Sequence, residues 1–167
     1  MEINRVIVGP LQTNCYILSK DNICLVIDPG DEINKINEVI GNKKVLGVIV
    51  THSHFDHIGA LSYFNENIIM DKSNLEEQEY NIGGLKFEVI YTPGHKEDSI
   101  TIYFRKEKVM FTGDFIFKDD IGRTDLQGGD MTLMIDSLNK MKEYNKDIII
   151  YPGHGDMTNL GIELNRY

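Results

Sequence analysis

Residues 45–51 form an almost unbroken apolar run, which ends in a segment carrying four potential metal ligands: His52, His54, Asp56 and His57. A short apolar run of this kind is typical of a strand buried on both faces, so its sheet needs a covering layer on each side. In such sheets, ligand-binding residues lie in the loops beyond the carboxyl ends of the strands. The segment therefore predicts a layered fold with a site at the end of a central strand.

The spacing of these four residues favours two adjacent metal ions over one. His52 and His54 are two positions apart, so in an extended loop their side chains project to the same side. Asp56 and His57 lie where the chain turns into the next predicted helix and can reach a second point nearby. The donors are nitrogen and oxygen without sulfur. Imidazole suits zinc, iron, copper and nickel, and carboxylates also admit manganese.

The remaining two histidines also follow predicted strands. His95 and His154 come directly after Pro-Gly pairs, which mark turns, and Asp114 follows Gly113 at another strand end. No histidine falls in a helix interior or in a polar surface run. This shared placement favours a common metal centre. The alternative, five loop histidines that only cap strands, predicts no metal and no loss of activity on substitution.

Composition narrows the class of protein. The chain has 167 residues, of which 41% are hydrophobic and 26% charged, which is typical of a soluble globular protein and predicts one domain over residues 1–167. The net charge of −9 argues against nucleic-acid or anionic-membrane partners, because both require clustered cations. No apolar run is long enough to span a bilayer, and no secretory signal is visible. Cys15 and Cys24 are expected to be small buried hydrophobes, and a cytoplasmic location is the default.

Periodicity and turn signals predict the order of the elements. Strands are expected at residues 3–8, 14–19, 23–27, 45–51, 68–70, 85–91, 99–105, 108–112 and 148–151, with 115–117 as a candidate extension. Helices are expected at 32–40 after an Asp31 cap, at 57–65, at 74–80, at about 131–144 after an Asp130 cap, and in the tail. Periodicity alone supports α/β or α+β. The order of the elements favours an αββα four-layer sandwich, in which two mixed sheets lie between helices.

The segment His52-Ser53-His54-Phe55-Asp56-His57 resembles the HxHxDH signature of the metallo-β-lactamase superfamily. Four further motifs are similar to later motifs of that superfamily, in the same order: Gly59, Pro93-Gly94-His95, Gly113-Asp114 and Pro152-Gly153-His154-Gly155. The resemblance covers almost the whole chain and implies the αββα fold of that superfamily. It also implies that Asp28, in Asp28-Pro29-Gly30, supports the metal loop without binding metal.

The resemblance further implies a ligand set for two divalent ions, zinc first, with iron or manganese as alternatives. The first metal position would be formed by His52, His54 and His95, and the second by Asp56, His57 and His154, with Asp114 bridging them. Asp114 stands where the best-known β-lactamases have a cysteine. Residues 121–130 are similar to the GRxD loop of small single-domain glyoxalase II-like proteins. Together these features point to the hydroxyacylglutathione hydrolase-like branch.

Two departures from the family pattern bear on the substrate. Lys96 follows His95 at a position where the family often has a threonine that supports the metal ligands. The chain also ends soon after His154, without the C-terminal helical domain that supplies much of the glutathione contact in two-domain glyoxalase II enzymes. The identity of the thiol and of the acyl group therefore stays open.

The sequence thus predicts a metal-dependent hydrolase, a thioesterase, that acts on a small acyl thioester by attack of a metal-bridging hydroxide. Asp56 and Asp114 would orient the nucleophile as well as bind metal, and Arg123 is the candidate contact for an anionic substrate. Arg123 fits a surface pair with Asp125 or Asp120 equally well. The alternatives are a mononuclear-iron persulfide dioxygenase, a broad-specificity metallo-hydrolase and a non-catalytic metal-binding protein. Asp114 argues against β-lactam hydrolysis, and the oligomeric state is open.

Overall fold

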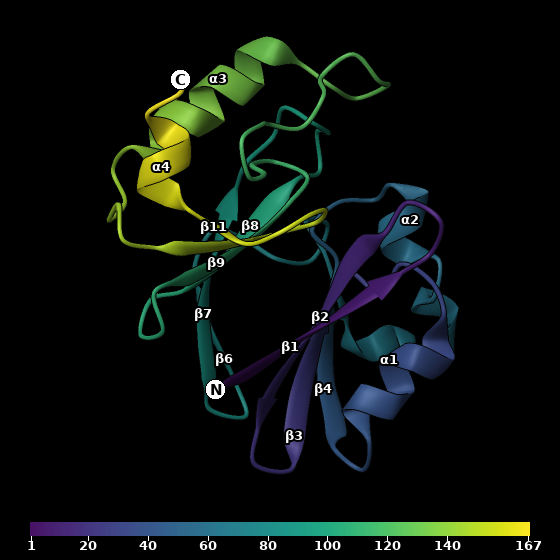
Figure 1. The fold of residues 1–167 in the computed structure, drawn as a ribbon. Coiled ribbons are helices and arrows are strands. Elements are labelled where there is room, and N and C mark those ends of the chain that lie inside the picture. The colour runs from purple at the N-terminus through teal and green to yellow at the C-terminus, as the bar shows by residue number, and fades with distance from the viewer.

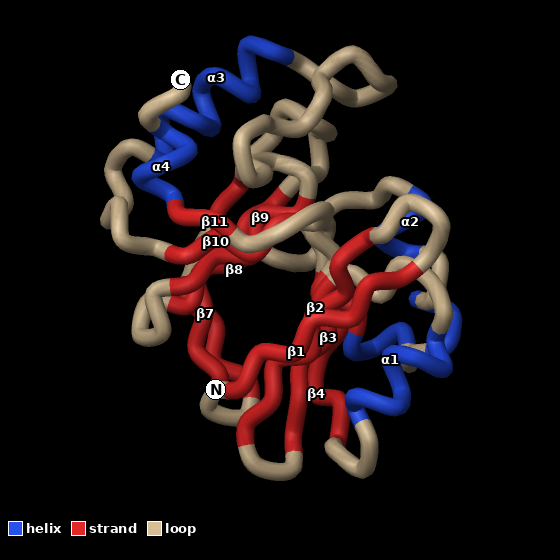
Figure 2. Tube along the Cα trace, viewed as in Figure 1, coloured by secondary structure: helices blue, strands red, loops and turns tan.

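Two β-sheets pack face to face, with helices on their outer sides, in the computed structural model of residues 1–167 (Figures 1 and 2). The first sheet has the order β1 (Glu2–Val8), β2 (Thr13–Lys20), β3 (Ile23–Ile27), β4 (Lys44–Ile49) and β5 (Ile69–Met70). The second sheet has the order β11 (Thr158–Asn159), β10 (Ile149–Pro152), β9 (Val109–Gly113), β8 (Ile100–Phe104), β7 (Leu85–Tyr91) and β6 (Glu79–Ile82). The predicted αββα sandwich is confirmed.

Four α-helices cover the two sheets. Helices α1 (Ile33–Ile40) and α2 (Phe55–Ile58) lie beside the first sheet, and α3 (Met131–Met141) and α4 (Leu160–Leu164) lie over the second (Figure 1). Both sheets are mixed, because β3, β4 and β5 pair in parallel in one and β9 and β10 pair in parallel in the other. None of the helices combines the length and the apolar character that crossing a bilayer requires.

The core has three layers of buried side chains, and each layer holds two structural layers together. Tyr16, Ile49 and Phe111 belong to the cluster between the two sheets. The cluster between the first sheet and α1 contains both cysteines, Cys15 and Cys24, which are fully buried and unpaired as expected. A third cluster lies between the second sheet and the two C-terminal helices. This layering explains why the central strands are apolar on both faces.

The helix predicted at residues 57–65 is wrong. Helix α2 begins two residues earlier and ends at Ile58, and only a short 3₁₀ turn, Leu61–Tyr63, follows it. The backbone N–H of Ala60 donates to the carbonyl of Pro29, 2.9 Å away, and so does not continue the helix. At Gly59 a Cβ atom would lie 2.2 Å from the Gly30 oxygen, so this close crossing of two chain segments ends the helix.

The helix predicted at residues 74–80 is also wrong. Residues 71–75 form a single turn, in which the Leu75 N–H donates to the Asp71 carbonyl, and the chain then enters edge strand β6. Strand β6 pairs antiparallel with β7 across Gly83-Gly84. The Leu-Glu-Glu-Gln stretch has a local preference for helix, and this preference is all that sequence propensity measures. Pairing with a neighbouring strand outweighs it here.

The predicted caps have mixed outcomes. Asp130 caps α3, since its Oδ1 accepts from the N–H groups of Thr132 and Leu133 at 2.7 and 3.1 Å. Asp31 does not cap α1. The N-cap residue is Glu32, at φ 47°, and the Asp31 carboxylate accepts from the N–H of Glu32 itself. The Glu32 side chain instead accepts from the N–H of Gly9, 2.9 Å away, and so ties α1 to the turn after β1.

Two predictions near α3 need correction. The helix ends at Met141, before the expected residue 144, and its buried side chains are Met134, Ser137, Leu138 and Met141. The helical spacing of this segment predicts Met131 and Ile135 in the core together with Met134, but they are 52% and 51% exposed. Ile135 lies about 100° around the helix from Met134 and so leaves the inward stripe.

The strand extension predicted at residues 115–117 is also wrong. These residues do not extend β9; they contribute only an isolated bridge between Ile116 and Ile121.

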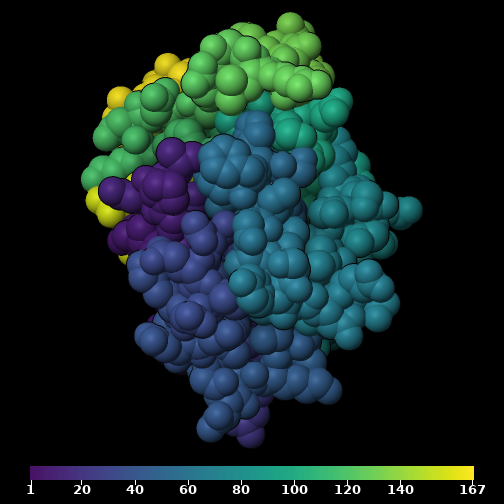
Figure 3. All heavy atoms as spheres, turned by 90° about the vertical axis from the view of Figure 1, so that its right-hand side faces the viewer, coloured from purple at the N-terminus to yellow at the C-terminus, as the bar shows by residue number.

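The N-terminal hairpin turn lies beside the segment that follows β4. In the space-filling view of Figure 3, purple residues near the N-terminus adjoin the blue residues around α2. A hollow of about 160 Å³ between them is lined by residues that include Leu11, Thr13, Phe55 and Asp56. This contact brings the start of the chain to the histidine-rich loop.

Candidate metal centre

Loops that follow four different strands converge at one edge of the sandwich. The loop after β4 carries His52 to His57, and the loops after β7, β9 and β10 carry His95, Asp114 and His154 respectively. The structure brings all seven predicted ligands together, in three overlapping groups whose ligand atoms lie within 4.8 Å of one another. Placement of the groups at the carboxyl ends of strands is the arrangement expected for ligand sites in such sheets.

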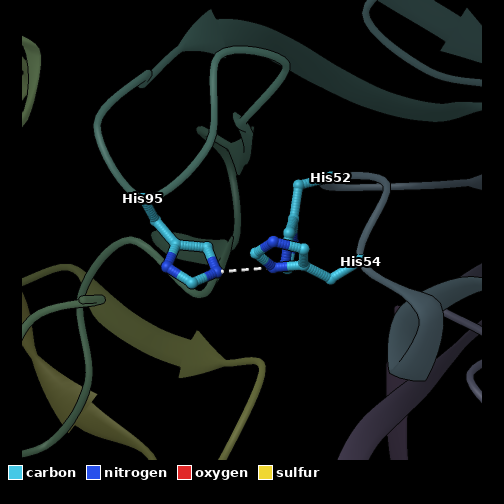
Figure 4. A group of neighbouring side chains, drawn as sticks. All are labelled: His52, His54 and His95. Atoms are coloured by element: carbon cyan, nitrogen blue, oxygen red, sulfur yellow. Dashed lines mark hydrogen bonds between the residues drawn. The ribbon is translucent and has the colours of Figure 1, made fainter. Parts of the chain in front are cut away.

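The first group consists of His52, His54 and His95, and we call it the first cluster. His52 and His54 come from one loop and His95 approaches from the opposite side (Figure 4). The Nδ1 atom of His54 is 2.8 Å from Nε2 of His95 and 3.1 Å from Nε2 of His52. Three ring nitrogens therefore meet at one point, as the alternation of His52 and His54 predicts.

The second cluster consists of Asp56, His57 and His154. The Oδ2 atom of Asp56 is 3.2 Å from Nε2 of His154 and 3.5 Å from Nε2 of His57. Both Asp56 and His57 come from α2, and the ring of His57 also packs against that of His52, with the ring centroids 4.1 Å apart. The two clusters are therefore direct neighbours.

Asp114 lies between the two clusters. Its Oδ2 atom is 3.6 Å from Nε2 of His95 and 3.5 Å from Nε2 of His154, and its Oδ1 atom is 3.3 Å from Nε2 of His57. One carboxylate therefore contacts histidines of both clusters. This is the position that a residue bridging two cations must occupy.

The outer ring nitrogens of four histidines are held by acceptors, which fixes the nitrogen that faces the centre. Nδ1 of His154 donates to the Leu11 carbonyl (3.0 Å), and Nδ1 of His95 donates to the Arg123 carbonyl (2.8 Å). Nδ1 of His57 donates to the carboxylate of Asp28 (2.9 Å). His52 has its Nδ1 3.2 Å from the Thr51 hydroxyl. Each Nε2 then points inward, an arrangement usual for metal-binding histidines. Two of these acceptors are backbone carbonyls, for which the sequence carries no signal.

Asp28 supports the loop that carries His52 to His57 through contacts with Thr51 and with the outer ring nitrogen of His57. Its carboxylate accepts from the N–H and the hydroxyl of Thr51, each at 2.7 Å, and from Nδ1 of His57. Asp28 is almost fully buried and adopts a positive φ of 51°. The structure thus places it where a residue that orients the ligands is expected.

The residues of the two clusters and Asp114 fit a metal centre for two reasons: their side chains are common metal ligands, and some of their buried polar atoms have no partner. Nε2 of His57 and Oδ1 of Asp114 are buried and have no hydrogen-bond partner. Such atoms are costly in a protein interior unless an ion or other partner satisfies them. A Cβ at Gly153 would lie 2.3 Å from Oδ1 of Asp114, so glycine is required there for the carboxylate to reach this place. Imidazole and carboxylate ligands suit zinc, iron or manganese.

The electrostatics of the two clusters differ. Burial, followed by the neighbouring His57, lowers the pKa of His52 well below its ordinary value, and burial and His95 lower that of His54. Burial opposes charge on His57 and His154, but Asp28 and Asp114 raise the pKa of His57 to about 10, and Asp114 and Asp56 raise that of His154 to about 9. Burial opposes the ionisation of Asp56 and Asp114. The hydrogen bond from His154 and the charge of His57 nevertheless hold the pKa values of both carboxylates low.

Arg123 does not point its charge into the centre. Its guanidinium pairs with Asp125 through two contacts of 2.7 Å, and its side chain is 61% exposed. The pair is the surface arrangement that the sequence allowed as the alternative, and contact with substrate stays a prediction. No feature of the sequence indicates that the Arg123 carbonyl holds His95.

The charged group of Lys96, unlike that of Arg123, contacts the loop that carries His54. Its ammonium donates to the Ser53 hydroxyl at 2.6 Å and is 3.6 Å from Oδ1 of Asp98. The Ser53 N–H in turn donates to Asp98, so these residues join the loop of His54 to the loop of His95. Lys96 and His54 also line a hollow of about 450 Å³, together with Glu97, Leu126, Gln127 and Gly128.

Comparison with known proteins identifies the class that this fold and centre define. The family model described as the metallo-β-lactamase superfamily matches residues 8–71 and 66–154. The chain therefore belongs to the metallo-β-lactamase superfamily, a superfamily of metal-dependent hydrolases.

Particular relatives fall within this class. A probable metallo-hydrolase named YqgX, from Bacillus subtilis (strain 168), is 33% identical over an alignment covering 96% of this chain and 93% of the relative. The hydroxyacylglutathione hydrolase GloC from Haemophilus influenzae is also 33% identical, with coverage of 98% and 95%. Both are similar to this chain over nearly their whole length, so the likeness includes the loops that carry the centre.

Solved structures show the same architecture. The structure of BLEG-1, a B3 metallo-β-lactamase, has a TM-score of 0.90 and 31% identity, covering 98% of this chain and 97% of that one. TTHA1623, described in a di-iron-bound form, has a TM-score of 0.84 and 28% identity, covering 96% of each chain. One of these neighbours holds two iron ions, so the fold and the residue types leave the identity of the metal in this chain open.

Proposed function

We propose that this chain is a two-metal hydrolase of small acyl thioesters. The proposal depends above all on Asp114, whose Oδ2 lies 3.6 Å from His95 and 3.5 Å from His154 and so can serve both clusters at once. Two divalent ions, zinc in the first instance, would be held by the first and second clusters. When bound, such ions lower the pKa of water toward about 7 and polarise a carbonyl oxygen.

The side chains of the centre would bind the ions and orient the attacking water. The lowered pKa values of Asp56 and Asp114 keep both carboxylates ionised at neutral pH, so either can accept a hydrogen bond from water between the clusters. The inward-facing Nε2 atoms of His52 and His95 offer lone pairs to the first ion, because their Nδ1 atoms face hydrogen-bond acceptors. A departing thiolate, with an ordinary thiol pKa of about 8.5, needs no strong protein acid.

The surroundings of the centre suit a small substrate with both apolar and polar parts. On the side of the first cluster, Lys96 and Gln127 line the 450 Å³ hollow beside His54. On the side of the second cluster, Leu11 and Phe55 are 51% and 71% exposed. Similarity to GloC, a hydroxyacylglutathione hydrolase, supports thioesters as the substrate class. Arg123 remains the predicted contact for an anionic group at the rim.

The test is a substrate panel on protein with a measured metal content. Chains loaded with two equivalents of zinc would be offered acyl thioesters of several thiols, glutathione included, with thiol release as the signal. We expect turnover of at least one thioester and its loss, together with the bound metal, in the His54→Ala variant. Metal-loaded protein that releases no thiol from any thioester would contradict the proposal.

Further arms of the same panel separate the competing functions. Similarity to BLEG-1 makes a β-lactam arm necessary, and preferential lactam turnover would replace the thioesterase proposal. One bound iron with oxygen uptake on a persulfide would favour the dioxygenase. Two bound metals without turnover of any ester, thioester, lactam or persulfide would favour a non-catalytic metal-binding protein.

A further inference from the structure

The segment between β1 and β2 contacts the second cluster through a side chain that the sequence did not single out. The hydroxyl of Thr13 donates to Oδ2 of Asp56 at 2.8 Å. Oδ2 is the oxygen of Asp56 that faces His154 and His57. Thr13 is only 1% exposed, so water does not compete for this hydrogen bond.

The same segment also holds His154. The Leu11 carbonyl accepts from Nδ1 of His154 at 3.0 Å, and the backbone of Thr13 forms an isolated bridge with His154. The Asn14 N–H donates to the Gly153 carbonyl at 2.7 Å, and the Asn14 side chain donates to the carbonyls of Pro152 and Gly155. Residues 11–14 therefore fix two of the three members of the second cluster.

None of these contacts is made to the first cluster. His52 is supported by Thr51, His95 by the Arg123 carbonyl, and the loop of His54 by Lys96 and Asp98. The two clusters share Asp114 but draw their other support from different parts of the chain. A change confined to residues 11–14 should therefore act on one cluster alone.

A carboxylate that ligates a metal is oriented by the hydrogen bonds that it accepts. Without the Thr13 hydroxyl, the carboxylate of Asp56 would be free to rotate and present either oxygen to the cation. Loss of such an outer contact typically weakens metal binding or activity about 10- to 100-fold. The threonine methyl and its burial would be retained by valine, so the hydroxyl can be removed with little change in shape.

We propose that Thr13 is a positioning residue for the second metal ion, and that its hydroxyl sets the affinity of the second cluster independently of the first. The inference rests on the two-metal centre of the proposed function. Metal binding can be measured without any substrate. A failure of the thioester panel therefore does not decide this proposal, which is tested by zinc binding alone.

The experiment measures stepwise zinc binding by competition with a chromophoric chelator, on metal-free protein of the parent chain and of three variants. Thr13→Val removes the hydroxyl, and Thr13→Ser retains it. Ser19→Ala is the matched control, because Ser19 lies further along β2 and its buried hydroxyl has no hydrogen-bond partner. Thermal unfolding of each metal-free variant shows whether it is folded.

We expect Thr13→Val to bind the first zinc equivalent like the parent and the second about 10- to 100-fold more weakly. Thr13→Ser and Ser19→Ala should bind both equivalents like the parent. Equal weakening of both equivalents, an unchanged second equivalent, or a parent chain that takes up only one ion would each overturn the proposal. If Thr13→Val does not fold, Thr13→Ala removes the same hydroxyl, and a weakened second equivalent in that variant would support the proposal while parent-like binding would contradict it.

Discussion

The two clusters of the candidate centre lie side by side yet differ in charge. The first cluster is built from imidazoles, and burial lowers the pKa of His52 and His54, so these rings are neutral at pH 7. The second contains a carboxylate and two histidines, His57 and His154, whose pKa values are raised by nearby aspartates. Without an ion, the first cluster is therefore ready to donate lone pairs, whereas the second holds protons that a metal must displace. Residue type alone does not set this difference, because both clusters contain histidine; the placement of Asp28, Asp56 and Asp114 sets it.

Removing the residue common to both clusters should have the largest effect. In Asp114→Ala, both metal positions lose a ligand, so we expect bound zinc and thioester turnover to fall together below detection. Elemental analysis after gel filtration and the thiol-release assay check this. Asp125→Ala is the control, since Asp125 is exposed and pairs only with Arg123. A variant at Asp114 that retains both ions would mean that the clusters do not share this carboxylate.

Replacing Asp28 should act unequally on the two clusters. Asp28→Asn keeps the shape of the side chain but removes the charge that faces Nδ1 of His57. We expect the second zinc equivalent to bind about 10- to 100-fold more weakly, and the first to change less. Stepwise zinc titration measures both. A larger loss at the first equivalent would show that Asp28 acts mainly through Thr51 and the loop of His52.

Proton release on metal binding tests the charge difference directly. In the metal-free chain at pH 7, His57 and His154, with pKa values of about 10 and about 9, are protonated, while His52 and His54 are neutral. Filling the second cluster should therefore release up to two protons from its histidines and filling the first cluster close to none, and affinity for the second ion should rise as pH increases from 7 to 9. Calorimetry in buffers of different ionisation enthalpy counts these protons. Equal release at both steps would contradict the assignment.

The raised pKa of His57 also predicts how the stability of the metal-free fold changes with pH. The pKa of His57 is raised above its unfolded value of about 6.5, so its charge stabilises the metal-free fold fully below that pH. This contribution is lost as pH rises through about 10. The metal-free chain should therefore unfold at progressively lower temperature between pH 7 and pH 10. A melting temperature that rises over this range would show that His57 is neutral in the metal-free fold.

The smallest effect is expected at Lys96. Its contacts with Ser53 and Asp98 join two loops of the first cluster but lie near the surface, where such pairs contribute about 1 kcal/mol or less. Lys96→Met should therefore weaken the first zinc equivalent by about fivefold at most and leave the second unchanged. Lys35→Met, which removes an exposed pair with Glu32 on α1, is the control. Weakening confined to the second equivalent would reverse the comparison.

The sequence predicted the centre better than its support. The His52 to His57 segment, the Pro-Gly turns before His95 and His154, and the strand end at Asp114 mark seven candidate ligands, because spacing and strand ends are visible in the residues themselves. The Leu11 and Arg123 carbonyls that hold His154 and His95 are backbone atoms, and any residue offers them. Thr13 lies 43 positions from Asp56, and nothing near it marks a partner.

The fold shows the same limit. The apolar run at residues 45–51 predicted the layers of the sandwich correctly, because a strand that is apolar on both faces needs a packed layer on each side. The helix predicted at residues 74–80 is replaced at its end by edge strand β6, because the pairing of β6 with β7 is a tertiary contact that outweighs local preference. Asp31 is a favourable N-cap residue, yet Glu32 occupies the cap position without capping the helix, and its side chain instead accepts from the N–H of Gly9, 23 residues away.

The contact between Leu11 and His154 joins positions 143 residues apart. In order of synthesis, the first cluster has all its histidines once residue 95 has emerged, whereas the second waits for residue 154 and for the N-terminal turn to meet it. A chain cut short before β10 would keep the histidines of the first cluster and lose His154 from the second. The second ion thus reports whether both ends of the chain have reached their places.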